Sequence, residues 1–264
     1  MPESLILTPK EMNDSLVNIG RKKVGMKLSQ VFMYAILAGM YIALGAIAAS
    51  IVLAPDPGQG AAKFFAGVVF STGLILVVVA GGELFTGNML MTAGYIEKKY
   101  FFAHIIKNWA VVWLGNFVGA AFVVYLFYGS GYLHSDSPVG QYLAGAADKK
   151  LALDFFQAFL RGILCNILVC LAVVLSLSSV STEGKILAIM FPITAFIIGG
   201  YEHCVANMFF LPAGLLAKGE FVSRWPEMIR NLFPVTLGNI VGGVIIVLLH
   251  PQSFKRLKKY LGKQ

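Results

Sequence analysis

Long apolar stretches without a charged residue alternate with more polar links along the whole chain. Residues 28–55, 108–135 and 162–182 contain no Asp, Glu, Lys or Arg. Each stretch is long enough for a membrane-spanning helix, which needs about 20 apolar residues. The pattern predicts an all-α integral membrane protein with six spans, at about residues 30–54, 64–97, 104–130, 153–180, 186–217 and 231–250.

Two of the predicted spans are too long for one helix, and each carries polar residues in its middle. The second is interrupted near Glu83–Asn88 and the fifth near Glu202–Asn207. Each pattern predicts two half-helices joined by a non-helical link. Such a link at membrane depth is tolerated only where it is buried in protein or lines a cavity.

The two interruptions belong to an internal repeat. "GGELFTGNM" at 81–89 matches "GYEHCVANM" at 200–208, and "KNWAVVWLGNFVG" at 107–119 matches "RNLFPVTLGNIVG" at 230–242. We also match "AILAG" at 35–39 with "AFLRG" at 158–162. Three spans are an odd number, so the second copy must be inverted. Inverted repeats with paired broken helices predict a substrate path near the bilayer midplane.

The distribution of charged residues supports an even number of spans and separates two basic tails from the channel domain. Only 13% of the residues are charged, against about 25% in a soluble domain, and the net charge of +8 is concentrated near the two ends. Basic flanks mark the cytoplasmic side, so we expect both termini inside, with a tail at 1–28, one channel domain at 29–252 and a basic tail at 253–264. Within the domain, repeat 1 covers about 29–130 and repeat 2 about 150–250. Nucleic-acid binding by these tails is the weaker interpretation, because they adjoin apolar segments.

The two interrupted motifs, together with "LGN" followed by "VG" in spans three and six, resemble the formate/nitrite transporter family over roughly residues 25–250. Within that family the sequence looks closest to the hydrosulfide ion channel branch. The resemblance implies a homopentamer in which each subunit has its own pore and an aquaporin-like fold of six helices. It also implies small monovalent anions as substrates.

His203 is the strongest functional candidate, because it lies within the second interruption in the middle of a predicted span. An ionisable residue inside the membrane is a functional hypothesis by default. The family resemblance implies that it hydrogen-bonds or protonates the passing anion, with Thr86 opposite it. For either residue, a bond to the unwound backbone alone is the structural alternative.

Four polar residues paired by the repeat are expected to support the interruptions. Two bare carboxylates in an anion path would repel the substrate. We therefore expect Glu83 and Glu202 to face the scaffold and to accept hydrogen bonds from loop N–H groups. Asn116 and Asn239 are further candidate partners for that backbone.

The family resemblance adds further residues to the path. Asn166 would contact the central histidine network, with interhelical hydrogen bonding as the alternative. Lys150, before span four at the expected external mouth, would attract anions, with a solvated charge as the alternative. Apolar slits that gate by excluding water are implied at Phe70, Leu74, Leu84 and Phe196.

These observations predict a membrane channel for small monovalent anions in the cell (inner) membrane, with proton-assisted passage at the histidine. Hydrosulfide is favoured, with formate and nitrite close behind. No nucleotide motif, metal-ligand set or catalytic group is evident, so we expect no cofactor. An aquaporin-like channel for neutral solutes is the alternative, although the paired Asn-Pro-Ala signature is absent. A membrane enzyme that uses His203 lacks a second catalytic partner.

Overall fold

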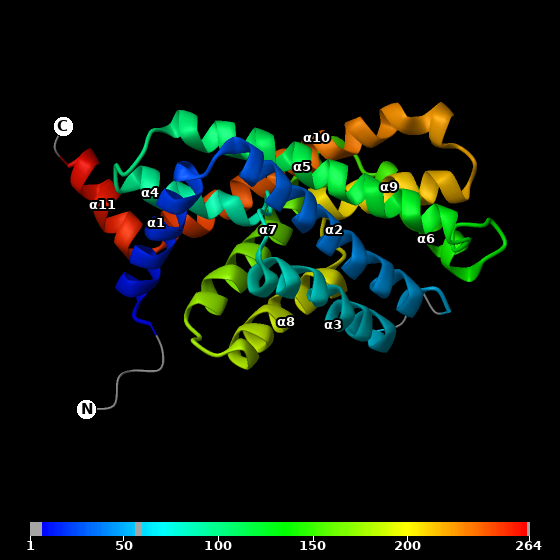
Figure 1. Ribbon diagram of the computed structural model, residues 1–264, viewed down its shortest axis with the longest axis horizontal. Helices are drawn as coiled ribbons and strands as arrows, with labels where there is room; N and C mark the ends of the chain where they lie inside the picture. The colour runs from blue at the N-terminus through cyan, green and yellow to red at the C-terminus, as the bar shows by residue number, and fades with distance from the viewer. Residues whose placement is uncertain (1–6, 56–59, 263–264) are drawn as a thin grey trace.

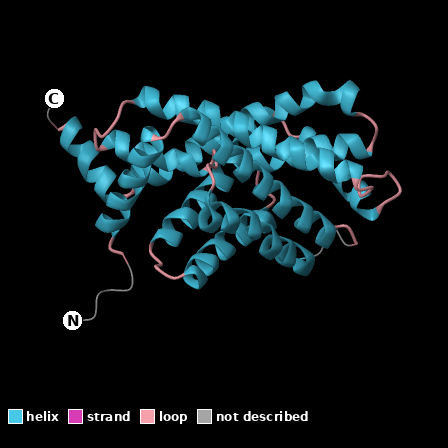
Figure 2. Cartoon of the chain, viewed as in Figure 1, coloured by secondary structure: helices cyan, strands magenta, loops and turns pink. Residues whose placement is uncertain are grey.

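The computed structural model describes residues 7–55 and 60–262, and every regular element in these residues is a helix (Figure 2). The elements in chain order are α1 (Pro9–Gly25), α2 (Leu28–Leu53), α3 (Gly60–Leu76), the π-helix η1 (Val77–Gly81), the 3₁₀-helix η2 (Gly87–Met91), α4 (Thr92–Ile96), α5 (Phe102–Gly129), α6 (Pro138–Leu151), α7 (Phe155–Leu177), α8 (Thr182–Gly199), α9 (Cys204–Ala217), α10 (Phe221–Leu249) and α11 (Pro251–Leu261).

The described residues contain six helices that are long and apolar enough to cross a membrane. They are Leu28–Leu53, Gly60–Gly81, Phe102–Gly129, Phe155–Leu177, Thr182–Gly199 and Phe221–Leu249. The second and fifth are continued, after a break, by the short helices η2 and α4 and by α9. The predicted all-α membrane fold with two broken spans is therefore confirmed.

The two halves of the chain pack alike but run in opposite directions. Helix α5 packs on α2, α10 packs on α7, and α3 meets α8 between the halves (Figure 1). The start of α2 and the end of α7 line one cavity, whereas the end of α2 and the start of α7 line another. This arrangement is the predicted inverted repeat. Helices α1 and α11 contact each other at one end of the molecule.

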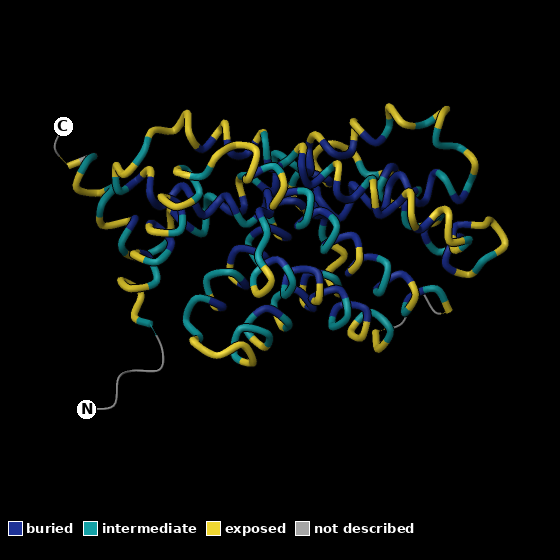
Figure 3. Tube along the Cα trace, viewed as in Figure 1, coloured by how far each residue is buried: buried dark blue, intermediate teal, exposed yellow. Residues whose placement is uncertain are grey.

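The buried core lies where the two breaks meet (Figure 3). Every residue of 204–215, the first twelve of α9, is buried. These residues include polar Asn207 as well as apolar ones such as Phe209 and Leu211. A helix that is apolar and buried all round lies inside a bundle, so α9 is enclosed by the other helices.

Small residues bring α5 against α2 and α10 against α7. A Cβ atom on Gly119 would overlap the carbonyl oxygen of Ile36, and one on Gly242 would overlap the carbonyl oxygen of Ile163. Glycines spaced four residues apart allow such close approach between membrane helices.

Gly119→Ala should therefore destabilise the protein, because the added methyl forces α5 away from α2. Overpacking of this kind costs about 1–3 kcal/mol. Gly129→Ala, at the open end of the same helix, is the matched control, since no atom lies within 4 Å of its added Cβ. Thermal unfolding of the detergent-solubilised protein measures both variants. Equal midpoints for Gly119→Ala and wild type would contradict the packing argument.

The register of the repeat in the first helix of each half differs from the sequence match by one helical turn. Ile36 and Ile163 occupy equivalent contacts, and they are 127 residues apart, whereas "AILAG" and "AFLRG" are 123 apart. A shift of four residues keeps the same helix face, so an apolar helix matches itself almost as well one turn out of register. The structure thus pairs Tyr34 with Arg161 and Ala35 with Gly162.

One helix lies at residues 138–151, between the predicted spans 104–130 and 153–180, where the sequence pattern predicted no span. Helix α6 begins with Ser137 as its N-cap and Pro138 in the first turn, both of which favour helix starts. It packs against α9, where a Cβ on Gly214 would overlap the Leu143 carbonyl oxygen. The turn residues before Pro138 suggested a loop, so the apolar residues of α6, such as Val139 and Leu143, were not predicted to be buried.

Helix α10 begins at Phe221, about ten residues before the predicted span at 231. In its polar first turns, Arg224 forms ion pairs with Glu227 of the same helix and with Glu220, the N-cap residue. Beside them, the Lys218 ammonium holds the pKa of the Asp148 carboxyl below its ordinary value. The polar residues that ended the predicted span therefore extend the helix.

Candidate functional site

Both broken spans end their first half at a glycine in the left-handed region. Gly81 has φ of 95° at the end of η1, and Gly200 has φ of 62° after α8. Residues with a Cβ rarely adopt this conformation, whereas glycine does so readily. Residues 82–86 and 201–203 then run without helical structure to η2 and α9.

Asn116 of α5 fixes the first break. Its Oδ1 accepts a hydrogen bond from the Phe85 N–H (2.9 Å), and its Nδ2 donates to the carbonyl oxygens of Ala35 (2.7 Å) and Glu83 (2.9 Å). These bonds use the acceptor and both donors of the amide. One side chain thus joins α2, α5 and the break, and it satisfies backbone groups that a helix would otherwise pair.

Asn239 of α10 does the same at the second break. Its Oδ1 accepts from the Cys204 N–H (2.8 Å), and its Nδ2 donates to the carbonyl oxygens of Gly162 (2.8 Å) and Glu202 (2.9 Å). The two sets of contacts correspond atom for atom. The internal repeat therefore extends to the hydrogen bonds that hold the unwound backbone.

Glu83 is held by side chains from two elements, and a third element supports one of them. Its Oε1 accepts from the Lys23 ammonium of α1 (2.6 Å), and its Oε2 accepts from the Asn88 amide (2.7 Å). The Asn88 amide also donates to the Asn108 side-chain oxygen (2.7 Å). The carboxylate is thus paired with a cation, and its partners are side chains where the sequence suggested loop N–H groups.

Glu202 repeats this pattern in the other half. Its Oε1 accepts from the Lys150 ammonium (2.9 Å), and its Oε2 accepts from the Asn207 amide (2.6 Å). The Asn207 amide also donates to the Asn231 side-chain oxygen (2.9 Å), and Asn231 donates to the Lys150 carbonyl oxygen (2.8 Å). Lys150 lies at the wall of a cavity, but its charge is balanced by Glu202.

His203 and Thr86 meet between the two breaks. The Nε2 atom of His203 lies 3.0 Å from the Thr86 hydroxyl oxygen, and both side chains are buried. The Nδ1 atom accepts a hydrogen bond from the Ala206 N–H (3.1 Å), which caps α9. A neutral imidazole has one donor and one acceptor nitrogen, so this network assigns the hydrogen to Nε2. The ring then donates to the Thr86 oxygen and leaves the hydroxyl hydrogen for another acceptor.

Asn166 of α7 holds the backbone beneath this pair. Its Nδ2 donates to the carbonyl oxygen of Thr86 (3.2 Å) and to that of Asn239 (2.5 Å). It therefore reaches His203 only indirectly, through Thr86. Its Oδ1 is buried without a hydrogen-bond partner among the described residues.

Buried apolar side chains lie near His203 and Thr86 and line the two neighbouring cavities. The rings of Phe70 and Phe196 meet edge to face at 5.3 Å, and the Phe196 ring stacks on the His203 ring at 6.0 Å. Leu74 and Leu84 are buried, with 2% and 3% of their surface exposed. Of the four residues that the family resemblance assigned to slits, Phe70 and Phe196 thus form an aromatic pair, and Leu74 and Leu84 line one cavity.

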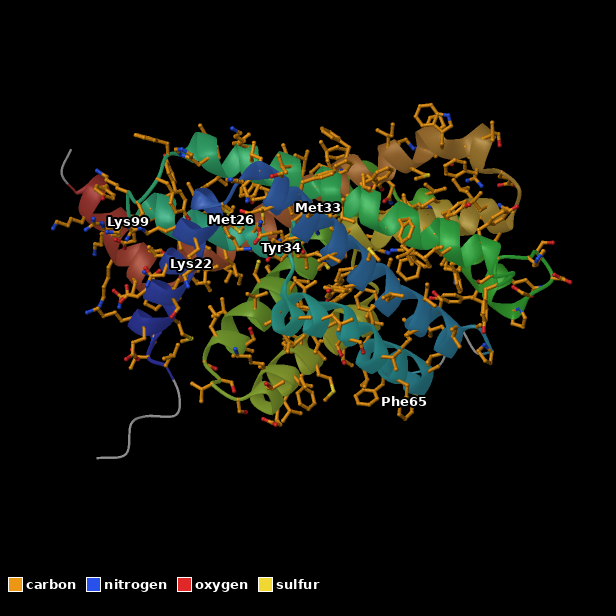
Figure 4. The ribbon with its side chains drawn as sticks, in the orientation of Figure 1. Lys22, Met26, Met33, Tyr34, Phe65 and Lys99 are labelled. Atoms are coloured by element: carbon orange, nitrogen blue, oxygen red, sulfur yellow. The ribbon has the colours of Figure 1, made fainter. Side chains whose placement is uncertain are left out.

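Two cavities approach this closed centre from opposite ends. One, of about 540 Å³, is lined by Leu74, Leu84 and Lys23, and by the Lys22, Met26 and Tyr34 side chains that are labelled in Figure 4. The other, of about 370 Å³, is lined by Phe70, Phe196, His203 and Lys150. Among the described residues, none lines both cavities, so the two cavities do not meet in this structure.

Lys23 and the side chains of Asn108 and Asn231 were not predicted from the sequence. The asparagines occupy matching positions in the repeated 107–119 and 230–242 segments, so the repeat contained a signal for them. Lys23 is the counterpart of Lys150 only in the structural register of 127 residues, which the sequence match did not find.

The chain is similar to transport proteins over most of its length. It is 42% identical to a probable formate transporter of Methanothermobacter thermautotrophicus, with 91% of this chain and 94% of the relative covered. A solved structure described as an FNT family ion channel is 30% identical with a TM-score of 0.79, covering 90% of this chain and 96% of that chain. A pentameric formate channel with formate bound is 33% identical with a TM-score of 0.73, covering 89% and 98%.

The fold likeness extends to a more distant class. The aquaglyceroporin from Plasmodium falciparum has a TM-score of 0.54 at 16% identity, covering 89% of this chain and 100% of that chain. This confirms the predicted aquaporin-like fold and carries nothing about the substrate. The sequence model for the formate/nitrite transporter matches residues 10–251. The match spans both repeats and the whole closed centre between the cavities, and the chain belongs to the formate/nitrite transporter family.

Proposed function

We propose that the protein is a membrane channel for small monovalent anions and has no enzymatic activity. The observation that carries this proposal is the Thr86–His203 contact, a pair of neutral hydrogen-bonding groups between two apolar constrictions. Such a site can bind one small anion with few waters. We propose formate as the first substrate to test, because relatives of this chain are described as formate transporters and channels. Hydrosulfide, which the sequence resemblance favours, and nitrite follow.

Positive charge at both mouths supports an anionic substrate. Lys22, Lys23 and Lys185 line the larger cavity, where Glu83 is the carboxylate. The smaller cavity is lined by Lys63, Lys149, Lys150 and Arg161, with Glu202 as the carboxylate. Clefts of one charge sign raise the local concentration of the opposite ion. Each cavity therefore has an excess of positive charge.

At the closed centre the anion would have to lose water, and that cost must be offset by the protein. The Thr86 hydroxyl can donate to the anion, and so can the Nε2–H of His203 after it leaves the Thr86 oxygen. The backbone N–H groups at the start of α9 add positive potential.

The hydrogen bonds favour a donor role for His203 over delivery of a proton. A neutral imidazole that gave up its Nε2 proton would become an imidazolate. To form an imidazolium first, the ring must accept a proton at Nδ1 and lose the Ala206 N–H. We therefore propose that a proton that accompanies the anion comes from water, and that proton transfer from the histidine is the second candidate.

We also propose the assembly and the location. A relative of known structure is pentameric, and exposed apolar side chains such as Phe65 (Figure 4) suit lipid or a neighbouring subunit. The basic helices α1 and α11 lie at one end. Basic flanks mark the cytoplasmic face, so we propose that the protein lies in the cell (inner) membrane with both termini on the cytoplasmic side, and that α1 is part of the N-terminal segment 1–28.

Flux into proteoliposomes tests the proposal. Formate, nitrite and hydrosulfide should each cross faster than through empty liposomes, and glycerol should not. Stopped-flow light scattering and an internal pH dye measure the rates. Glycerol permeation without anion flux would instead support the neutral-solute alternative. Cross-linking in membranes followed by mass measurement should give a pentamer.

A further inference from the structure

The cation that is free to meet a substrate in the smaller cavity is not Lys150. Its ammonium is bound to Glu202, and it lies 5.4 Å from the centre of the Phe210 ring. Asn231 holds its backbone. A cation fixed in this way has its charge balanced and its donors directed at protein.

Arg161 lies in the same cavity and is exposed. It is the seventh residue of α7, roughly 9 Å along the helix axis from the first residue. Arginine at such depth faces water or a cavity rather than lipid. Among the described residues, no carboxylate lies within ion-pair distance of its guanidinium, and Glu202, the acidic residue of this cavity, is already bound to Lys150.

The repeat shows that Arg161 is not required to hold the break. Its carbonyl oxygen accepts from the Glu202 N–H (3.3 Å), as the Tyr34 carbonyl oxygen accepts from the Glu83 N–H (3.1 Å). Tyr34 lines the larger cavity as Arg161 lines the smaller one. Arg161 and Tyr34 therefore share the backbone contact, but their side chains differ. Since Tyr34 makes this contact without a charge, the contact does not explain the guanidinium of Arg161.

We propose that Arg161 is the first binding site for a planar anion with two oxygens, such as formate or nitrite, in the cavity that leads to His203. The inference rests on the proposed function and adds the substrate class. A guanidinium presents parallel N–H donors that match two oxygens at once, which a lysine ammonium does not. Hydrosulfide has one heavy atom and cannot use this fork. Arg161 thus makes the channel favour carboxylate-like anions over hydrosulfide at low concentration.

The test compares Arg161→Gln, Arg161→Lys and Lys149→Gln in proteoliposomes, with formate and hydrosulfide as substrates. Arg161→Gln should raise the half-saturating formate concentration roughly tenfold, which is the effect of one lost charge-assisted hydrogen bond, and should change hydrosulfide less. Arg161→Lys should return hydrosulfide uptake to the wild-type rate, while its half-saturating formate concentration should stay above that of wild type. Lys149→Gln, which removes a charge from the same cavity, should affect both anions equally and only at low salt.

Two outcomes would overturn the inference. If Arg161→Lys restores formate as well as hydrosulfide, the residue acts only through its charge. If Arg161→Gln leaves the half-saturating formate concentration unchanged, the residue does not bind the anion. Binding of ¹³C-formate to the detergent-solubilised protein, measured by saturation-transfer NMR, decides the site separately from transport. Wild-type protein that binds formate through Arg161 but carries no anion would contradict the proposed function and leave the binding site standing.

Discussion

Lys150→Met should destabilise the protein far more than the double variant Lys150→Met/Glu202→Gln. The single change leaves the Glu202 carboxylate without its cation in a site where that side chain is 3% exposed. Loss of one partner from a buried ion pair costs about 3–5 kcal/mol, whereas removal of both charges is often nearly neutral. Because Lys150 keeps 18% of its side chain exposed, we expect the lower end, about 3 kcal/mol.

Denaturation of the detergent-solubilised protein, followed by size-exclusion chromatography, measures this difference. Lys149→Met, at the neighbouring exposed residue, is the control and should unfold at the same denaturant concentration as wild type. The same comparison at Lys23 and Glu83 should give the same order, since the pair is built alike in the other half. A single variant that unfolds with wild type would show that the pair is not needed to hold the break.

The breaks and their asparagines were predictable because they are local in sequence and duplicated. The "GN" of each repeated segment contains the asparagine that the structure places on unwound backbone. The ion pairs of Lys23 and Lys150 were harder to predict, because each lysine reaches its carboxylate from another helix. The sequence match also left the register of the first helix of each repeat ambiguous by one turn. Which contact Lys150 makes depends on the position of α6, and that helix was hidden by its polar start.

Which ring nitrogen of His203 donates a hydrogen bond and which accepts one could not be predicted from the sequence. A histidine in a broken span suggests proton transfer, and proton-assisted passage was the prediction from the sequence. The position of the Ala206 N–H, 3.1 Å from Nδ1, is a consequence of the ring acting as the N-cap of α9. That single bond decides which nitrogen carries hydrogen, and so changes the proposed chemistry.

His203→Leu should reduce formate flux roughly ten- to hundredfold, because a hydrogen bond to a charged group contributes about 1.5–3 kcal/mol. His203→Asn should be milder, since asparagine caps helices well and its amide can still donate to the anion. Thr86→Val, which keeps the shape but loses the hydroxyl, should fall between wild type and His203→Leu. Flux into proteoliposomes at fixed protein density measures all three.

The pH profile of His203→Asn separates the two mechanisms. If the ring only donates a hydrogen bond, formate flux in this variant should keep the wild-type dependence on pH, because the proton comes from water. If the ring supplies the proton, an imidazolium must form, and replacement by an amide should remove the dependence over about pH 5 to 8, where an unperturbed histidine titrates. A flat profile in His203→Asn would therefore refute the donor role proposed here and support proton transfer through the histidine. The ring would then have to lose the hydrogen bond from the Ala206 N–H.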